Sequence, residues 1–157
     1  MIAIDLKVQL HDVGRAEICQ AILAELPEWF GIREARDAYA RYAATAPMVT
    51  AEVNKEVVGY VSLACHFDRN CEIHSMGVRP QWHRQGVGAA LVEAAVDFAN
   101  SKGFKFLSVK TLSDSHPDPN YAATRAFYHS VGFVPFEVLP ELWGAQLPCL
   151  MMVRQLK

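Results

Sequence analysis

The sequence has no excess of either charge, because 15 Lys and Arg residues face 17 Asp and Glu residues. A protein without a basic excess is not expected to bind nucleic acid through bulk electrostatics. No apolar run approaches the roughly 20 residues that a membrane helix needs. The first residues, 1–8, are interrupted by Asp5 and Lys7 and lack the features of a signal peptide. We therefore expect a cytoplasmic protein that contacts neither membranes nor nucleic acid.

Cysteine is also scarce, with Cys19, Cys65, Cys71 and Cys149 as its four occurrences and no Cys-x-x-Cys pair. Scattered cysteines in a chain that can bury its own core are expected to be buried thiols. Cys71 and His74 have the spacing of metal ligands, but residues three apart on a strand point to opposite faces. The usual set of four zinc ligands is missing as well. The sequence therefore predicts no metal site.

Repeats, low-complexity tracts and Ser/Gly-rich linkers are absent, and 157 residues fit one domain, 1–157. Hydrophobic periodicity predicts helices at Ala16–Leu26, Arg33–Ala44, Gly86–Asn100 and Tyr121–Val131. Alternating or β-branched runs predict strands at Ile2–Val8, Met48–Val53, Val57–Ala64, Cys71–Val78, Phe104–Leu112, Phe133–Val138 and Cys149–Leu156. This order predicts an α/β fold with one mixed sheet of about seven strands, flanked by about four helices.

The segment Val78–Leu91 is the most informative part of the chain. A predicted strand runs into a loop that carries Gly86 and Gly88, and the loop opens a predicted helix. The first amides of a helix have no internal acceptor, and the helix dipole adds positive charge there. Glycine lets the backbone approach a ligand closely. The segment therefore predicts a pyrophosphate cradle, to which His83 and Arg84 would add charge.

Two other phosphate-binding motifs do not fit this segment. A dinucleotide fingerprint would need glycine where Leu91 stands, and an acidic residue about 20 positions further on, where Ser108–Thr111 has none. A Walker loop would need Gly-Lys-Ser/Thr after its first glycine, and that triplet is missing.

The loop His83-Arg84-Gln85-Gly86-Val87-Gly88-Ala89 resembles the acetyl-CoA-binding motif of the GNAT superfamily, Gln/Arg-x-x-Gly-x-Gly/Ala, with histidine at the first position. Downstream, Asn120–Phe133 resembles the second GNAT signature, and it fits best at Tyr128 and Gly132-Phe133. Two motifs in this order are more specific than either alone. The resemblance covers residues from about 49 to the end of the chain. It implies the GNAT fold, acetyl-CoA as co-substrate and direct acetyl transfer to a primary amine in a ternary complex.

The resemblance also implies which residues contact the coenzyme. Tyr121 stands at the usual Asn position of the second signature and Thr124 at its usual Ala position. The expected coenzyme contacts are Met76, Gly77, Val78, His83, Arg84, Gln85, Gly86, Val87, Gly88, Ala89, Tyr121, Thr124 and Phe127. A bulge near Met76–Val78, which Gly77 would ease, is expected to present a backbone amide to the thioester carbonyl.

Acetyl transfer needs a neutral amine, a polarised carbonyl and a proton for the leaving thiolate. The resemblance implies Tyr128 as the general acid, and a phenol pKa of about 10 keeps it protonated. The base stays open: Glu72 stands where the histone-acetylating branch carries its glutamate, His74 titrates near neutrality, and other branches use water. Alternation places Glu72, His74 and Met76 on one face of their strand.

The expected acceptor site lies near the first helices and the last strands. Its candidate residues are Trp29, Phe30, Tyr39, Tyr42 and Trp143, since aromatic side chains suit a cationic amine. The acceptor is expected to be a small-molecule or peptide amine. Two alternatives remain: an acyl-CoA-binding sensor or partner module without catalysis, and a transferase of a longer acyl group. GNAT proteins are often dimers, which makes a homodimer possible.

Overall fold

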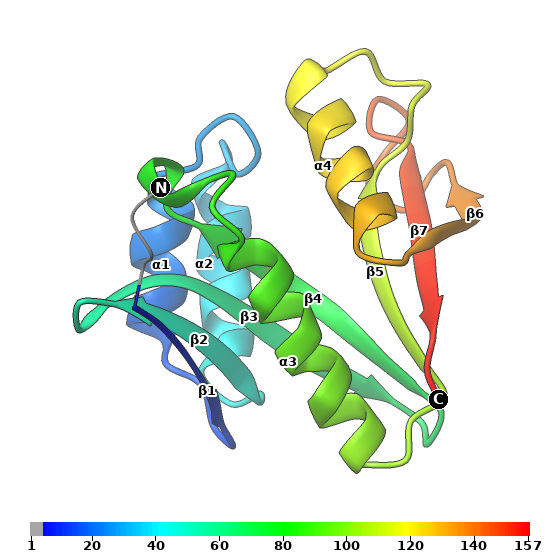
Figure 1. Cartoon of the computed structure of the whole chain (residues 1–157). Coiled ribbons are helices and arrows are strands. Elements are labelled where there is room, and N and C mark those ends of the chain that lie inside the picture. The colour runs from blue at the N-terminus through cyan, green and yellow to red at the C-terminus, as the bar shows by residue number, and fades with distance from the viewer. Residues whose placement is uncertain (1–4) are drawn as a thin grey trace. The chain divides into compact units, whose positions relative to one another are not determined.

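The computed structural model describes residues 5–157. In chain order its elements are β1 (Leu6–His11), α1 (Ala16–Ala24), α2 (Arg33–Ala43), β2 (Met48–Val53), β3 (Glu56–His66), β4 (Asn70–Val78), η1 (Pro80–Trp82), α3 (Val87–Ser101), β5 (Phe106–Leu112), α4 (Pro119–Ser130), β6 (Val134–Leu139) and β7 (Cys149–Gln155) (Figure 1). Over these residues the predicted order of strands and helices is confirmed. The predicted first strand, 2–8, lies partly outside the described residues.

The strands form a seven-stranded sheet in the order β1-β2-β3-β4-β5-β7-β6. β4 and β5 are parallel, whereas β7 is antiparallel to both β5 and β6. β1 and β2 are antiparallel, as are β2 and β3. The sheet is therefore mixed, as the sequence predicts.

Several boundaries differ from the prediction for local reasons. α1 ends before Leu26 because Pro27 disfavours helical geometry at the residue that precedes it, which is Leu26. α4 begins at Pro119, since the Asp118 side chain accepts a bond from the Asn120 amide at 2.8 Å and proline suits the first helical position. The turn between β2 and β3 has two residues, Asn54 and Lys55, with φ of 52° and 67°. Both are left-handed, as a type I′ hairpin requires.

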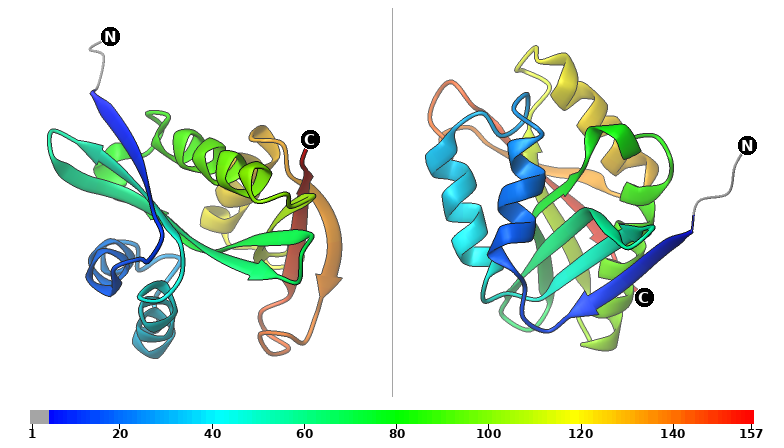
Figure 2. Two further views of the ribbon diagram at one scale, coloured as in Figure 1. Left: turned by 90° about the horizontal axis from the view of Figure 1, so that it is seen from below. Right: turned by 90° about the vertical axis from the view of Figure 1, so that its left-hand side faces the viewer.

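The chain packs into two compact units. The first comprises the chain up to Ala64 together with His74–Phe98, and the second comprises Cys65–Ile73 and Ala99–Lys157. Within the first unit, α1 and α2 cover one face of the strands and α3 covers the other (Figure 2). A Cβ on Gly77 would lie 3.0 Å from Ile22 of α1, and one on Gly59 would lie 2.9 Å from Leu91 of α3. Glycine at these positions therefore lets both helices approach the sheet closely.

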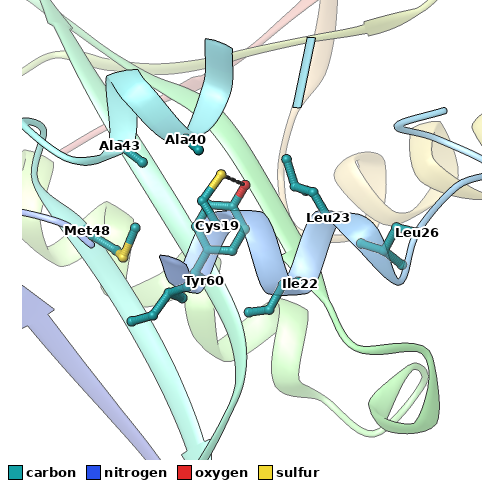
Figure 3. Packing of buried hydrophobic residues seen from close by; sticks show 9 residues of the cluster. Cys19, Ile22, Leu23, Leu26, Ala40, Ala43, Met48 and Tyr60 are labelled. Carbon is teal, nitrogen blue, oxygen red and sulfur yellow. Dashed lines mark hydrogen bonds between the residues drawn. The ribbon is translucent and has the colours of Figure 1, made fainter. Parts of the chain in front are cut away.

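The core of the first unit lies between α1, α2 and the sheet. Its central residue is Tyr60 of β3, whose ring is fully buried. The side chains packed around it come from both helices and β2, and include Cys19, Ile22, Leu23, Ala40, Ala43 and Met48 (Figure 3). Burial of one large apolar side chain contributes about 1.5–3 kcal/mol, so this cluster anchors both helices on the sheet.

The second unit is built on β5, β7 and β6, with α4 packed on β5. The parallel register of β4 and β5 runs from Asn70 opposite Phe106 to Ile73 opposite Val109. At the end of α4, the Phe133 amide donates to the Tyr128 carbonyl at 3.0 Å, which closes the helix as a Schellman motif does. Among the described helices, none is long and apolar enough to cross a membrane.

Candidate functional site

The candidate cradle lies in the first unit, where β4 leads through η1 to α3. Arg84 and Gly86 have φ of 60° and 84°, so two left-handed residues turn the chain into the helix. The Ala90 amide bonds back to the Gly86 carbonyl at 3.1 Å. The amides of residues 87–89 precede this first bonded amide, so they have no acceptor within the helix.

The space beside Gly86 suits a bound group. A Cβ at this position would meet no described atom within 4 Å. The Val87 side chain, by contrast, is 1% exposed and anchors the helix start in the core. Val87 can thus serve a ligand only through its backbone amide. The cradle, with its left-handed glycine, helix-start amides and an exposed Arg84, fits a pyrophosphate.

The other side chains of the loop brace it internally. His83 donates from Nε2 to the Val78 carbonyl at 2.6 Å, and its ring meets Trp29 edge-on with centroids 6.0 Å apart. Gln85 donates to the Gln81 carbonyl at 3.0 Å. His83, which replaces the Gln or Arg of the family pattern, therefore holds the loop against β4 and the α1–α2 loop.

Arg79 has a bracing role that sequence reasoning missed. Its Nε donates to the Val57 carbonyl at 2.9 Å, and its Nη1 forms an ion pair with Glu25. Glu56 lies 3.8 Å from Nε. The end of β4 is thus fastened to β3 and to the end of α1. The sequence shows only a basic residue before a proline at a strand end, which is a weak signal.

β4 loses its regular alternation in the candidate site. The His74 ring stacks on Tyr42 of α2, with centroids 3.9 Å apart, and meets Tyr39 edge-on at 5.5 Å. Ser75, the next residue, accepts a bond from Tyr60 in the core beneath α1, and Gly77 also faces α1. Consecutive strand residues normally point to opposite faces. His74 and Ser75 both meet the layer formed by α1 and α2, which is the effect of a β-bulge.

This irregularity corrects one expectation and refines another. Because Ser75 and Gly77 face α1, regular alternation puts Met76 on the other face, so the predicted common face of His74 and Met76 is wrong. The irregularity also falls between His74 and Ser75, ahead of Gly77. Gly77 instead allows α1 to pack closely against β4, because it has no side chain.

Glu72 lies in the second unit and is bonded through both carboxylate oxygens. His66 Nε2 lies 2.6 Å from Oε1, and Lys110 donates from Nζ to Oε2 at 2.7 Å. The Glu72 side chain is 8% exposed. Both carboxylate oxygens of Glu72 are thus engaged by partners within the second unit. Sequence reasoning missed both partners, because each comes from another strand.

Tyr128 of α4 is also in the second unit. It is 6% exposed and packs between Phe127 and Phe133, with ring centroids at 5.4 and 5.6 Å. Burial raises the pKa of its phenol well above the ordinary value, and nearby Tyr121 raises it further. The phenol therefore remains a proton donor at neutral pH. Thr124, one turn earlier on α4, donates its hydroxyl to the Asn120 carbonyl at 3.1 Å.

The candidate acceptor residues separate into groups. Phe30 meets Tyr39 edge-on at 5.8 Å, and Tyr39 and Tyr42 both contact His74. These four residues, called the aromatic cluster below, join the α1–α2 loop, α2 and β4. Trp29 instead contacts His83 of the cradle loop. Trp143 is exposed in the β6–β7 connection of the second unit.

Metal ligands are not gathered in the described part of the chain: residues 5–157 contain no group of three or more His, Cys, Asp or Glu side chains that could hold an ion.

Comparison with known proteins places these features in a family. The sequence profile of the acetyltransferase (GNAT) family matches residues 15–133. Over 94 residues the chain is 31% identical to an uncharacterized N-acetyltransferase of Methanocaldococcus jannaschii, covering 56% of this chain and 39% of that protein.

Solved structures agree on the fold. A protein of the GNAT family from Desulfovibrio desulfuricans superposes with a TM-score of 0.79 at 17% identity, over 96% of this chain and 98% of that one. A GNAT family acetyltransferase of Elizabethkingia anophelis, solved with acetyl-CoA bound, gives a TM-score of 0.73 at 18% identity, over 97% and 99% of the two chains. At these identities the likeness shows the fold.

Proposed function

The chain belongs to the GNAT acetyltransferase family, and we propose that it is an N-acetyltransferase that moves the acetyl group of acetyl-CoA to a primary amine. The cradle carries this proposal: a left-handed, open Gly86 at the start of α3, followed by helix-start amides. The match of residues 15–133 to the family supports it. The solved acetyl-CoA complex of a protein with the same fold supports the choice of coenzyme.

Each part of the cradle has a proposed task. The amides of residues 87–89 and the Arg84 side chain hold the pyrophosphate, since both supply positive charge. His83 and Gln85 keep the loop in shape through their bonds to Val78 and Gln81. Acetyl-CoA supplies the activated acetyl group as a thioester. By the family resemblance, a backbone amide of Met76–Val78 polarises the acetyl carbonyl, and Tyr121, Thr124 and Phe127 contact the coenzyme arm.

Proton transfer is assigned to two residues. Tyr128 gives its phenolic proton to the departing coenzyme A thiolate, and its burial keeps that proton in place until then. His74 takes the proton of the amine, because Glu72 has both oxygens bonded to His66 and Lys110. In this proposal Glu72 is a structural residue of β4 that forms ion pairs, and it is not the catalytic base. The aromatic cluster around His74 would receive the apolar part and the cationic charge of a small-molecule or peptide amine.

The test joins binding and turnover. The purified protein is titrated calorimetrically with acetyl-CoA, coenzyme A and longer acyl-CoAs, and then assayed with a panel of amines by detecting the released thiol. Micromolar binding of acetyl-CoA with thiol release that depends on an amine is the expected result. Binding without turnover for any amine would identify a sensor, and preference for a longer chain would identify a different acyl donor. No binding at all would refute the proposal.

A further inference from the structure

Tyr60 carries a hydroxyl where the core does not need one. Its ring is fully buried between α1, α2 and β3, and a phenylalanine would fill the same volume. Burial of a hydroxyl is unfavourable unless it is hydrogen-bonded. The presence of tyrosine at this position therefore requires an explanation beyond packing.

The hydroxyl joins three elements. It donates to Ser75 Oγ on β4 at 2.9 Å. Cys19 Sγ on α1 lies 3.2 Å from the same oxygen (Figure 3). A phenol has one proton, so the Cys19 thiol is the donor in the second contact. All three side chains are buried. Desolvation by burial raises the pKa of Tyr60, which keeps the hydroxyl neutral and able to donate.

Ser75 is the second of two consecutive β4 residues whose side chains meet the same helical layer. It follows His74, whose ring points to the same helical layer, and it precedes Met76–Val78. A bulge leaves its extra residue outside the regular ladder of backbone bonds. The bond from Tyr60 to Ser75 ties the backbone at this irregular step to the core.

We propose that Tyr60 is a positioning residue of the acetyl-transfer site, whose hydroxyl fixes Ser75 and through it the backbone of Met76–Val78. This inference rests on the proposed function, in which that backbone polarises the acetyl carbonyl. A donor must be placed accurately to stabilise charge that develops during reaction, whereas the phosphate cradle binds the coenzyme from a separate loop. Loss of the Tyr60 hydroxyl should therefore lower kcat and leave coenzyme affinity nearly unchanged.

The chain offers matched variants for the test. Tyr60→Phe removes the hydroxyl and keeps the ring, and Ser75→Ala removes its acceptor. Ser75→Thr keeps an acceptor. Cys19→Ala is the control, since it deletes the other contact of the same hydroxyl and leaves the bond to β4 intact.

Hydrogen exchange, read by mass spectrometry on peptides that cover residues 74–78, tests the link without any assay of activity. Tyr60→Phe and Ser75→Ala should speed exchange of these amides about 2- to 10-fold, the effect of one lost hydrogen bond on a local opening. Cys19→Ala should leave them unchanged while it lowers the melting temperature. Unchanged exchange in Tyr60→Phe would overturn the proposal whatever the activity shows.

Steady-state kinetics tests the consequence. Tyr60→Phe and Ser75→Ala should each lower kcat about tenfold with a coenzyme Kd within about twofold of wild type, since misplacement of reacting groups affects mainly the transition state. Their double variant should be no slower than either alone, because both changes break one bond. Ser75→Thr and Cys19→Ala should keep the wild-type kcat.

Failure of the inference and failure of the proposed function give different results. Multiplying losses in the double variant, or a kcat that falls only in step with stability across all four variants, would overturn the positioning role. If wild-type protein acetylates no amine while exchange still responds to Tyr60→Phe, the proposed function fails and the link from Tyr60 to β4 stands.

Discussion

The imidazole of His74 stacks on the ring of Tyr42, with centroids 3.9 Å apart and planes inclined by 26°. This stacking holds the imidazole against α2, within the aromatic cluster to which we assign the acceptor amine. Glu72, two residues earlier on β4, is bonded to His66 and Lys110. One strand thus carries a histidine among aromatic rings and a glutamate within an ion pair, and the two should respond differently to substitution.

His74→Gln should lower kcat/KM about 100-fold near neutral pH and remove the acidic limb of the pH profile, because general base catalysis is lost. Glu72→Gln should keep the acidic limb. It should instead reduce the free energy of unfolding by about 1–3 kcal/mol, since Lys110 and His66 lose a buried charged partner. Rate profiles and urea denaturation distinguish the two. An acidic limb that disappears in Glu72→Gln and persists in His74→Gln would reverse the assignment.

Tyr128→Phe should lower kcat by one or more orders of magnitude, since general acid catalysis contributes about 10²–10⁴-fold. The coenzyme Kd should change little, because the cradle precedes α3 and Tyr128 lies on α4. Burial raises the pKa of Tyr128, so its deprotonation should produce no alkaline fall in kcat below about pH 10. An unchanged kcat in the variant would remove Tyr128 from the mechanism.

The buried phenol of Tyr128 should also make stability depend on alkaline pH. Above the unfolded pKa of about 10, the unfolded chain loses a proton that the folded chain keeps. The free energy of unfolding should therefore be unaffected by this group below pH 10 and fall above it, by about 1.4 kcal/mol per pH unit. Denaturant titrations from pH 8 to 11 should show a shallower decline in Tyr128→Phe than in wild type. Equal slopes would mean that the phenol ionises with similar pKa values in both states.

The four thiols should differ in reactivity. Cys65 is exposed, whereas Cys71 is buried, and burial together with the neighbouring Cys65 raises the pKa of the Cys71 thiol to about 12. Because the thiolate is the nucleophile, iodoacetamide at pH 8 should label Cys65 at least about 100-fold faster than Cys71. Peptide mapping measures both rates, with unfolded protein as the control in which all four cysteines react. Similar rates in the folded protein would contradict the described packing of the β3–β4 hairpin.

Local sequence signals predicted the strongly periodic elements well. α3 follows from its apolar stripe and from Gly103, which adopts φ of 82° two residues after the last helical residue, Ser101. The β2–β3 hairpin follows from two β-branched runs around Asn54. The start of α4 was readable too, since Asp118-Pro119 is a cap followed by a favoured first residue, but the helix was predicted to begin at Tyr121.

Features that depend on distant partners were not readable. The irregularity at Ser75 reflects its bond to Tyr60, which lies on another strand, and the stacking of His74 on α2. The charges around Glu72 come from β3 and β5, and no local pattern states that β5 lies beside β4. His83 was predicted to add charge for phosphates, whereas the structure shows its bond to the Val78 carbonyl. Pairing order and tertiary contacts decide these roles.

The central claim is that the loop before α3 holds the coenzyme, and Gly86→Ala tests it most directly when Gly103→Ala is the control. Gly86 and Gly103 have φ of 84° and 82°, and a Cβ at either would meet no described atom within 4 Å. Both variants therefore carry similar backbone strain, of order 1–3 kcal/mol, at opposite ends of one helix. Calorimetric titration with acetyl-CoA should show at least tenfold weaker binding for Gly86→Ala and wild-type affinity for Gly103→Ala. Equal affinity in both variants and wild type would contradict the account, because the coenzyme would then not depend on the cradle.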